Sequence, residues 1–258
     1  MLLSTEALLL LCLGFFLVAT LYASVGFGGG SSYLALLTLF FISFFTIRSI
    51  ALVCNLVVVS GSTYLYFKYG HARMRDFFPF VITSIPMAFL GASFRLREQV
   101  FFVILGCSLI VSALFLAWQT YSALSRSHRT RPYPIMLNSI IGGAIGFLSG
   151  LVGIGGGIFL APVLHHLRWG TPLKIAALAS FFILVNSVSG VGGLFLSGTL
   201  ELPWRETLVL GFTVFLGGQL GIRLSLRRLS ANGIKRLTAL LVFLVGLRVL
   251  LKNGLELI

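Results

Sequence analysis

Two glycine clusters are the first candidates for a functional site in this sequence. Val25–Gly30 reads VGFGGG, and Val152–Gly157 reads VGIGGG 127 residues later, almost half of the 258-residue chain. Glycine destabilises a helix interior by roughly 0.5–1 kcal/mol relative to alanine, so each cluster predicts a break between two helices. The helix that starts after a break presents free N–H groups and about half a positive charge, which suits a small anion. The candidate anion-binding residues are Gly28, Gly29, Gly30, Ser31, Gly155, Gly156 and Gly157.

Close packing is the alternative explanation of the clusters, because glycines let helix backbones approach each other in lipid. The duplication within charge-free sequence favours a binding site. Asn55, Ser180 and Asn186 are further candidates, since a polar side chain in an apolar run must face the protein interior or water. They either line a substrate cavity or make hydrogen bonds between helices. Gln219, which lies in a glycine-rich run, carries the same two interpretations.

Several kinds of chemistry lack the residues that they need. No Asp, Glu, Lys or Arg lies near the centre of a predicted membrane span, which argues against a buried proton relay. The apolar runs contain no Walker motif, no HExxH motif and no Ser/His/Asp set. Cys12, Cys54 and Cys107 fall inside predicted spans, and the adjacent His165 and His166 cannot share one helix face. We therefore expect no enzyme activity, no cofactor and no metal site.

The composition identifies the class of protein that must position these residues. Hydrophobic residues make up 58% of the chain, charged residues make up only 10%, and the mean hydropathy is +1.05. Charge-free runs such as 99–125 and 175–200 exceed the roughly 20 apolar residues that one membrane crossing needs. These features predict an all-α polytopic membrane protein whose partner is the lipid bilayer. The net charge of +13 fits anchoring to anionic lipid and gives no reason to expect a nucleic acid.

The charge-free runs 7–47 and 132–167 are each too long for one helix and divide at their glycine clusters. Segment 154–168 is short and contains Pro162, so a half-helix is an option there. The sequence predicts a first transmembrane repeat (1–120), a basic cytoplasmic linker (121–134) and a second transmembrane repeat (135–258). About ten helices are expected, at 7–24, 27–45, 47–67, 77–95, 99–120, 134–151, 154–168, 172–197, 204–224 and 233–252.

The loop charges favour ten crossings with both termini outside the cell. One side of that topology carries thirteen Lys or Arg residues against one Asp, and the other carries six against five Glu. Lys and Arg in short loops mark the cytoplasmic side. Eight crossings, with both glycine segments as re-entrant hairpins, are the alternative. Five helices per repeat insert the second repeat upside down, and such inverted repeats place the glycine breaks and the binding site of a secondary transporter near the midplane.

Three segments of the second half carry a family resemblance. Gly146–Leu164 (GFLSGLVGIGGGIFLAPVL), Thr171–Ser180 (TPLKIAALAS) and Leu216–Gly221 (LGGQLG) resemble the TauE/SafE family of sulfite exporters and anion permeases. The resemblance covers nearly the whole chain. In the first half, Ser31–Leu36 replaces the continuation that contains a proline in the second half. The two half-sites are therefore expected to differ.

The resemblance implies a secondary transporter of sulfite, a sulfonate or a related sulfur oxyanion, which works by alternating access at paired glycine-rich half-helices. From the residues alone, the substrate is no narrower than a small anion. An anion channel and a membrane scaffold without transport activity are the alternatives, and assembly into a homo-oligomer stays open. We expect a multi-pass protein of the bacterial inner membrane.

Overall fold

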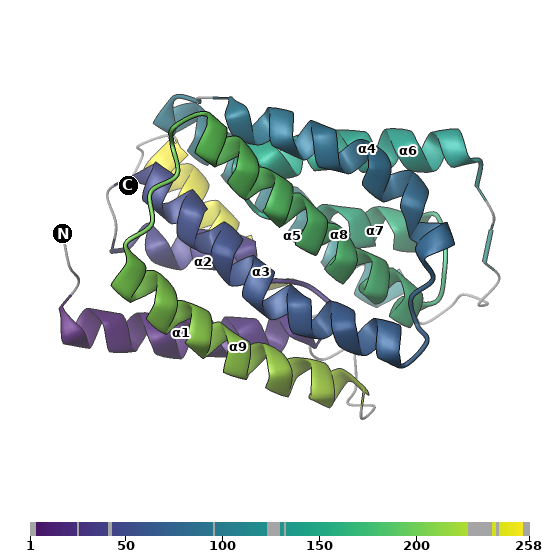
Figure 1. The fold of residues 1–258 in the computed structure, drawn as a ribbon, viewed down its shortest axis with the longest axis horizontal. Helices are drawn as coiled ribbons and strands as arrows, with labels where there is room; N and C mark the ends of the chain where they lie inside the picture. Colours follow the sequence, from purple (N-terminus) through teal and green to yellow (C-terminus); the bar gives the residue numbers. More distant parts are fainter. Residues whose placement is uncertain are drawn as a thin grey trace.

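The computed structural model is a bundle of long helices that run roughly side by side, with short helices between them (Figure 1). It describes residues 4–24, 26–40, 43–94, 96–122, 130–131, 133–226, 239–240 and 243–254, among which there is no strand. The elements are α1 (Thr5–Ala23), α2 (Gly30–Leu37), α3 (Phe44–Lys68), α4 (Met74–Ser93), α5 (Glu98–Ser122), α6 (Ile135–Val152), α7 (Gly157–His166), α8 (Pro172–Leu196), α9 (Trp204–Leu226) and a final π-helical turn, η2 (Val249–Gly254).

The predicted class of protein is confirmed by the length and the surface of the helices. In the described part of the chain, six helices are long and apolar enough to cross a membrane, namely α1, α3, α4, α6, α8 and α9. Large apolar side chains such as Leu9, Phe195 and Phe212 are exposed on the outside of the bundle. Such a surface suits lipid, because soluble monomers rarely expose large contiguous apolar patches. The chain is an all-helical, multi-pass membrane protein.

Both predicted helix breaks are present, and a short helix follows each of them. α2 has 8 residues and α7 has 10, so they extend over roughly 12 and 15 Å and neither spans a hydrocarbon core of about 30 Å. The half-helix proposed within 154–168 is therefore confirmed. The full helix predicted over 27–45 is wrong, because α2 ends at Leu37 and the Thr38 hydroxyl bonds back to the carbonyl oxygen of Ala35 at 2.8 Å.

The apolar sequence continues past this helix end, so hydropathy could not reveal it. The next helix, α3, begins at Phe44, three residues before the predicted start at 47. Figure 1 shows that α1 and α3 both start at the same end of the bundle, so the short α2 leaves the predicted assignment of loops to the two sides unchanged. Of the predicted helix 233–252, the structure describes residues 239–240 and 243–252. Most of the linker 121–134, including 123–129, lies outside the described residues.

Helices from the two halves of the chain interleave. α4 packs most extensively against α6 and also against α8, while α1 packs against α9, and α3 lies between α8 and α9. Glycines on one face of α6 make the first of these contacts possible, because methyl groups on Gly142, Gly146 and Gly150 would overlap the backbone of α4. Small residues four apart allow this close approach of two helix backbones in lipid. The predicted repeat boundary therefore does not separate two independently packed bodies.

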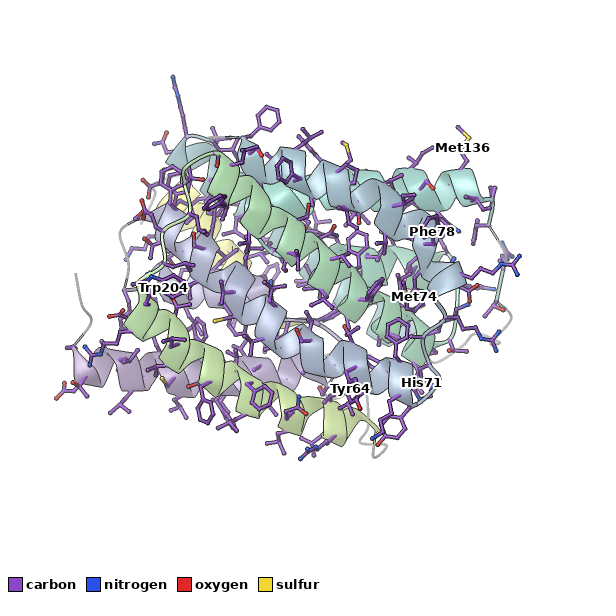
Figure 2. All side chains as sticks on the ribbon, in the orientation of Figure 1. Tyr64, His71, Met74, Phe78, Met136 and Trp204 are labelled. Carbon is purple, nitrogen blue, oxygen red and sulfur yellow. The ribbon has the colours of Figure 1, made fainter. Side chains whose placement is uncertain are left out.

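Polar contacts tie the helices together at both ends of the bundle. At the end where His71 and Met136 lie in Figure 2, the Lys174 Nζ atom lies 2.6 Å from Asp76 Oδ2. At the other end, where Trp204 lies, the Glu201 carboxylate accepts hydrogen bonds of 2.6 Å from the hydroxyls of both Ser43 and Thr46. Glu201 thus places a negative charge at the N-terminus of α3, which the helix dipole favours.

The close contact between α6 and α4 predicts that adjacent glycines of α6 respond differently to alanine. A methyl group on Gly146 would lie 2.6 Å from the Cα atom of Ser84, whereas one on Gly143 would lie 3.6 Å from Thr83, an ordinary contact. We expect Gly146→Ala to lower the melting temperature of the purified protein by several degrees, since overpacking typically costs about 1–3 kcal/mol. Gly143→Ala should leave it unchanged or slightly higher. Equal melting temperatures for the two variants would contradict this packing.

The sidedness of the bundle predicts which ends cysteine reagents reach in intact cells. Tyr69, which caps the end of α3 two residues before His71, has an exposed fraction of 56%. Trp204 has an exposed fraction of 68%, and Figure 2 shows it at the end of the bundle opposite His71. In a background without Cys12, Cys54 and Cys107, a membrane-impermeant maleimide should label Trp204→Cys from outside and Tyr69→Cys only after permeabilisation. The opposite pattern would reverse the topology that the loop charges predict.

Candidate functional site

Two turns rich in glycine form the centre of the candidate site. The first glycine turn (Gly26–Gly29) connects α1 to α2, and the second glycine turn (Gly153–Gly156) connects α6 to α7. Two residues of the first turn and three of the second have φ between 79° and 89°, all of them glycine. Residues with a Cβ atom adopt such angles only with strain, so these positions require glycine. Each turn leads into the N-terminus of a short helix, as the sequence predicts.

Each turn is held by a side chain from the other half of the chain. The Nδ2 atom of Asn55 in α3 donates a hydrogen bond of 2.8 Å to the carbonyl oxygen of Ile154 in the second turn. The Oγ atom of Ser180 in α8 donates a hydrogen bond of 3.0 Å to the carbonyl oxygen of Gly26 in the first turn. Both side chains are fully buried. The two bonds therefore satisfy carbonyl groups at helix breaks, where a buried backbone group needs a partner.

Asn55 contacts both glycine turns. A methyl group on Gly28 would overlap its amide oxygen, and one on Gly30 would overlap its amide nitrogen. A methyl group on Gly155, in the other turn, would lie 3.3 Å from the same nitrogen and 2.6 Å from the Cγ2 atom of Ile183. The glycines are thus required for packing as well as for backbone conformation. The packing explanation of the clusters is confirmed at these positions, and the binding explanation stays a prediction.

The two turns make corresponding contacts with α3 and α8. Both helices have 25 residues, and Asn55 and Ile183 are the twelfth residue of each. Arg48 and Ala176 are the fifth residue of each, where Arg48 faces Gly153 and Ala176 faces Gly26. The geometry of the contacts is repeated, but the side chains differ, as the departure of the first copy from the second predicts.

Arg48 is the residue whose position differs most from the one that the sequence predicts. The loop charges count it on the outer side, at the start of the predicted helix 47–67, but α3 begins three residues earlier and the structure buries the Arg48 side chain completely. Its Nη2 atom donates a hydrogen bond of 3.0 Å to the carbonyl oxygen of Gly150, in the last turn of α6. Its guanidinium carbon lies 5.6 Å from the centre of the Phe101 ring. Within the described residues, its Nε and Nη1 atoms have no hydrogen-bond partner.

Two serine hydroxyls adjoin the second glycine turn. The Oγ atom of Ser187 lies 3.1 Å from the position of a methyl group on Gly155, and that of Ser149 lies 3.2 Å from the position of one on Gly156. Both serines are buried, and neither hydroxyl has a hydrogen-bond partner in the part of the chain that the structure describes. Together with Arg48, they border this turn with polar groups from α3, α6 and α8.

The remaining predicted site residues lie in different surroundings. At the start of α2, the Ser31 hydroxyl lies 3.4 Å from the hydroxyl of Tyr22, which is only 2.7 Å from that of Ser32. Asn186 is buried, and its amide atoms have no partner among the described residues. Gln219 is half-buried and packs its amide against Gly61 of α3. The structure therefore brings Asn55 and Ser180 to the glycine turns and Gln219 to a contact between helices.

Arg48, Ser149 and Ser187 are the polar residues of this region that sequence reasoning missed as site residues. Arg48 left a signal, since it is the single charged residue between Glu6 and Lys68. The serines left none, because hydroxyls are common in apolar helices, where they can bond to their own backbone. Among the described residues, no three His, Cys, Asp or Glu side chains are grouped so that they could hold a metal ion. The region offers N–H, hydroxyl and guanidinium donors, which suit an anion.

Comparison with known proteins gives relatives along most of the chain. The "Probable membrane transporter protein y4hK" of Sinorhizobium fredii is 35% identical over 247 residues, which cover 93% of this chain and 97% of that protein. The "Probable membrane transporter protein YunE" of Bacillus subtilis is 27% identical over 203 residues, with 72% and 73% covered. A similarly named protein of Methanocaldococcus jannaschii, MJ0441, is 26% identical over 156 residues, with 57% and 55% covered.

No solved structure matches the chain significantly. The family described as "Sulfite exporter TauE/SafE" matches residues 11–249, which include both glycine turns, most of α1 and the five other described helices that could span a membrane. The chain therefore belongs to the TauE/SafE family of membrane transporters.

Proposed function

We propose that this protein is a secondary transporter of a small anion, with sulfite, a sulfonate or a related sulfur oxyanion as its substrate. The observation that carries the proposal is the pair of crosswise hydrogen bonds, in which Asn55 holds the second glycine turn and Ser180 holds the first. These bonds bring two helix breaks, from opposite halves of the chain, into one buried region. Broken helices that meet in this way form the substrate sites of many secondary transporters.

The electrostatics of the region favour an anion. The first N–H groups of α2 and α7 have no partner within their own helices, and each helix start carries a partial positive charge. The acidic side chains of the described residues lie at or before helix starts, and neither glycine turn contains one; they are Glu6, Asp76, Glu98, Glu201 and Glu206. A dehydrated anion at the turns would therefore find hydrogen-bond donors.

Alternating access is supported by the arrangement of the two halves. α1 begins at one end of the bundle and α6 begins at the other, so corresponding helices run in opposite directions (Figure 1). The turns repeat their contacts with α3 and α8 at matching positions. We infer two inverted repeats with the substrate between them. A movement of one repeat against the other would alter the crosswise bonds and expose the site to one side at a time.

An anion channel is the alternative mechanism. Asn55 and Ser180 are fully buried, and the polar groups around the turns are closed off from the surface, which favours a carrier that occludes its substrate. The choice of sulfur anions rests on the name of the family, "Sulfite exporter TauE/SafE". The relatives compared above are named only as probable membrane transporters.

Transport by the purified protein tests the proposed function directly. In proteoliposomes, we expect uptake of radiolabelled sulfite to saturate with concentration and to accelerate when unlabelled sulfite is present on the far side. Thiosulfate, sulfate and taurine are the competitors that define the substrate. Flux that rises linearly with concentration, together with single-channel currents, would support a channel instead. If none of these anions crosses faster than in empty liposomes, the proposed substrate class is wrong.

The crosswise hydrogen bonds predict a difference between two serines of α8. Ser180 donates to the first glycine turn, whereas Ser189, also buried, donates to the carbonyl oxygen of Ile85 in α4 at 2.5 Å. Alanine at either position leaves a buried carbonyl without its partner, so both variants should lose about 1–3 kcal/mol of stability. We expect Ser180→Ala to lower the transport rate severalfold and Ser189→Ala to retain most of it. If the two variants lose transport rate equally in proteoliposomes, Ser180 contributes only to the packing of the helices.

A further inference from the structure

Arg48 carries a charge that the described structure does not neutralise. Its side chain has an exposed fraction of 0%, and the ion pair found among the described residues joins Lys174 to Asp76. Glu201 approaches the same helix end, but its carboxylate accepts from Ser43 and Thr46. An unpaired guanidinium is costly to bury, so buried charges in proteins are normally paired or hydrogen-bonded. Among the described residues, Arg48 has one hydrogen bond, to the carbonyl oxygen of Gly150.

The surroundings of Arg48 also contain polar atoms without partners. Arg48 packs against Gly153, with its Nε atom 3.7 Å from the position of a methyl group on that residue. Ser149 and Ser187 border the following residues of the same turn, and their hydroxyls have no partner in the described part of the chain. Three donor side chains from three helices therefore surround one four-residue turn. They lie beside the N-terminus of α7, which begins at Gly157.

The first glycine turn has no equivalent of this charge. Ala176 takes the position of Arg48, and its Cβ atom would lie 2.6 Å from a methyl group on Gly26. Ser180 is engaged with the carbonyl oxygen of Gly26. The hydroxyls at the start of α2 are close to that of Tyr22. The Tyr33 hydroxyl, which adjoins Gly29, has no partner among the described residues, but it is uncharged. The positive side-chain charge thus lies at the second turn, next to two unpartnered serine hydroxyls.

We propose that Arg48, Ser149 and Ser187 form, with the N-terminus of α7, an anion-binding subsite at the second glycine turn. The ligand is a small oxyanion with at least two charged or strongly polar oxygens, because a guanidinium and two hydroxyls can donate to several oxygens at once. The inference rests on the proposed function for the identity of the anion. It adds that the permanent positive charge that binds the anion comes from Arg48, in the first half of the chain.

A capping role is the simpler explanation of Arg48. Its bond to Gly150 satisfies a carbonyl near the end of α6, and a cation is favourable at a helix C-terminus. A capping role explains the hydrogen bond of Nη2, but it does not explain why Nε and Nη1 are buried without a partner among the described residues. The two explanations differ in how anion binding should depend on Arg48. A cap contributes the same stability with or without an anion, whereas a counter-charge makes binding depend on the positive charge.

Anion affinity of the purified, detergent-solubilised protein separates these explanations. We would titrate sulfite, thiosulfate and sulfate into wild type and into Arg48→Gln, Arg48→Lys and Ser187→Ala variants by calorimetry. Lys174→Gln is the matched control, because it removes a positive charge at the end of the bundle. We expect Arg48→Gln to weaken binding by about tenfold to a hundredfold, as loss of a hydrogen bond to a charged group does. Arg48→Lys and Ser187→Ala should weaken it less, and Lys174→Gln should leave it unchanged.

The possible outcomes distinguish a failure of the proposed subsite from a failure of the proposed function. Folded Arg48→Gln that binds anions as tightly as wild type overturns the subsite while leaving anion transport in place. If that variant does not fold, the double variant Ser149→Ala, Ser187→Ala decides, and unchanged affinity again overturns the subsite. A wild type that binds and transports none of the anions removes the proposed function, and the subsite with it. A loss of affinity equal in Lys174→Gln and Arg48→Gln assigns the effect to net charge and overturns the local role of Arg48.

Discussion

Backbone N–H and C=O groups have no water to bond with inside a bilayer, and this constraint governs the rest of the structure. An unbroken helix satisfies it internally, but a helix break leaves carbonyl groups that need another partner. Here the partners are Asn55 for the second turn and Ser180 for the first. Each comes from the opposite half, so the breaks can exist only where the two halves meet. The location of the candidate site is therefore a consequence of how its backbone is satisfied.

Glycine serves two purposes in this fold, and they are difficult to separate by substitution. In the turns, positive φ angles exclude other residues, and the lack of a side chain lets Asn55 and Ile183 approach the backbone. Along α6, glycine in regular helix brings α4 within backbone contact. A substrate near the turns would use the same absence of side chains. Substitutions of the polar residues around the turns therefore distinguish a packing role from a binding role better than substitutions of the glycines do.

Much of the fold could be predicted from the sequence, because charge-free runs and glycine clusters are direct signs of long apolar helices and their breaks. The early end of α2 could not, since the residues after Leu37 are as apolar as those within it. Within the site, Asn55 and Ser180 stood out as rare polar groups in apolar runs. Arg48 is visible as a lone charge, but a charge beside a predicted loop is assigned to that loop, because only tertiary packing buries it. Serines such as Ser187 give no signal until neighbouring elements are placed.

The interleaved packing also bears on how the protein can be made. α4 packs against α6, α1 packs against α9, and the carbonyl group of Gly26 in the first turn accepts its hydrogen bond from Ser180. A ribosome delivers the first half long before α8 and α9 emerge. Until translation supplies α8 and α9, the nascent first half therefore lacks the Ser180 hydroxyl that bonds to its first turn and the helix that packs against α1.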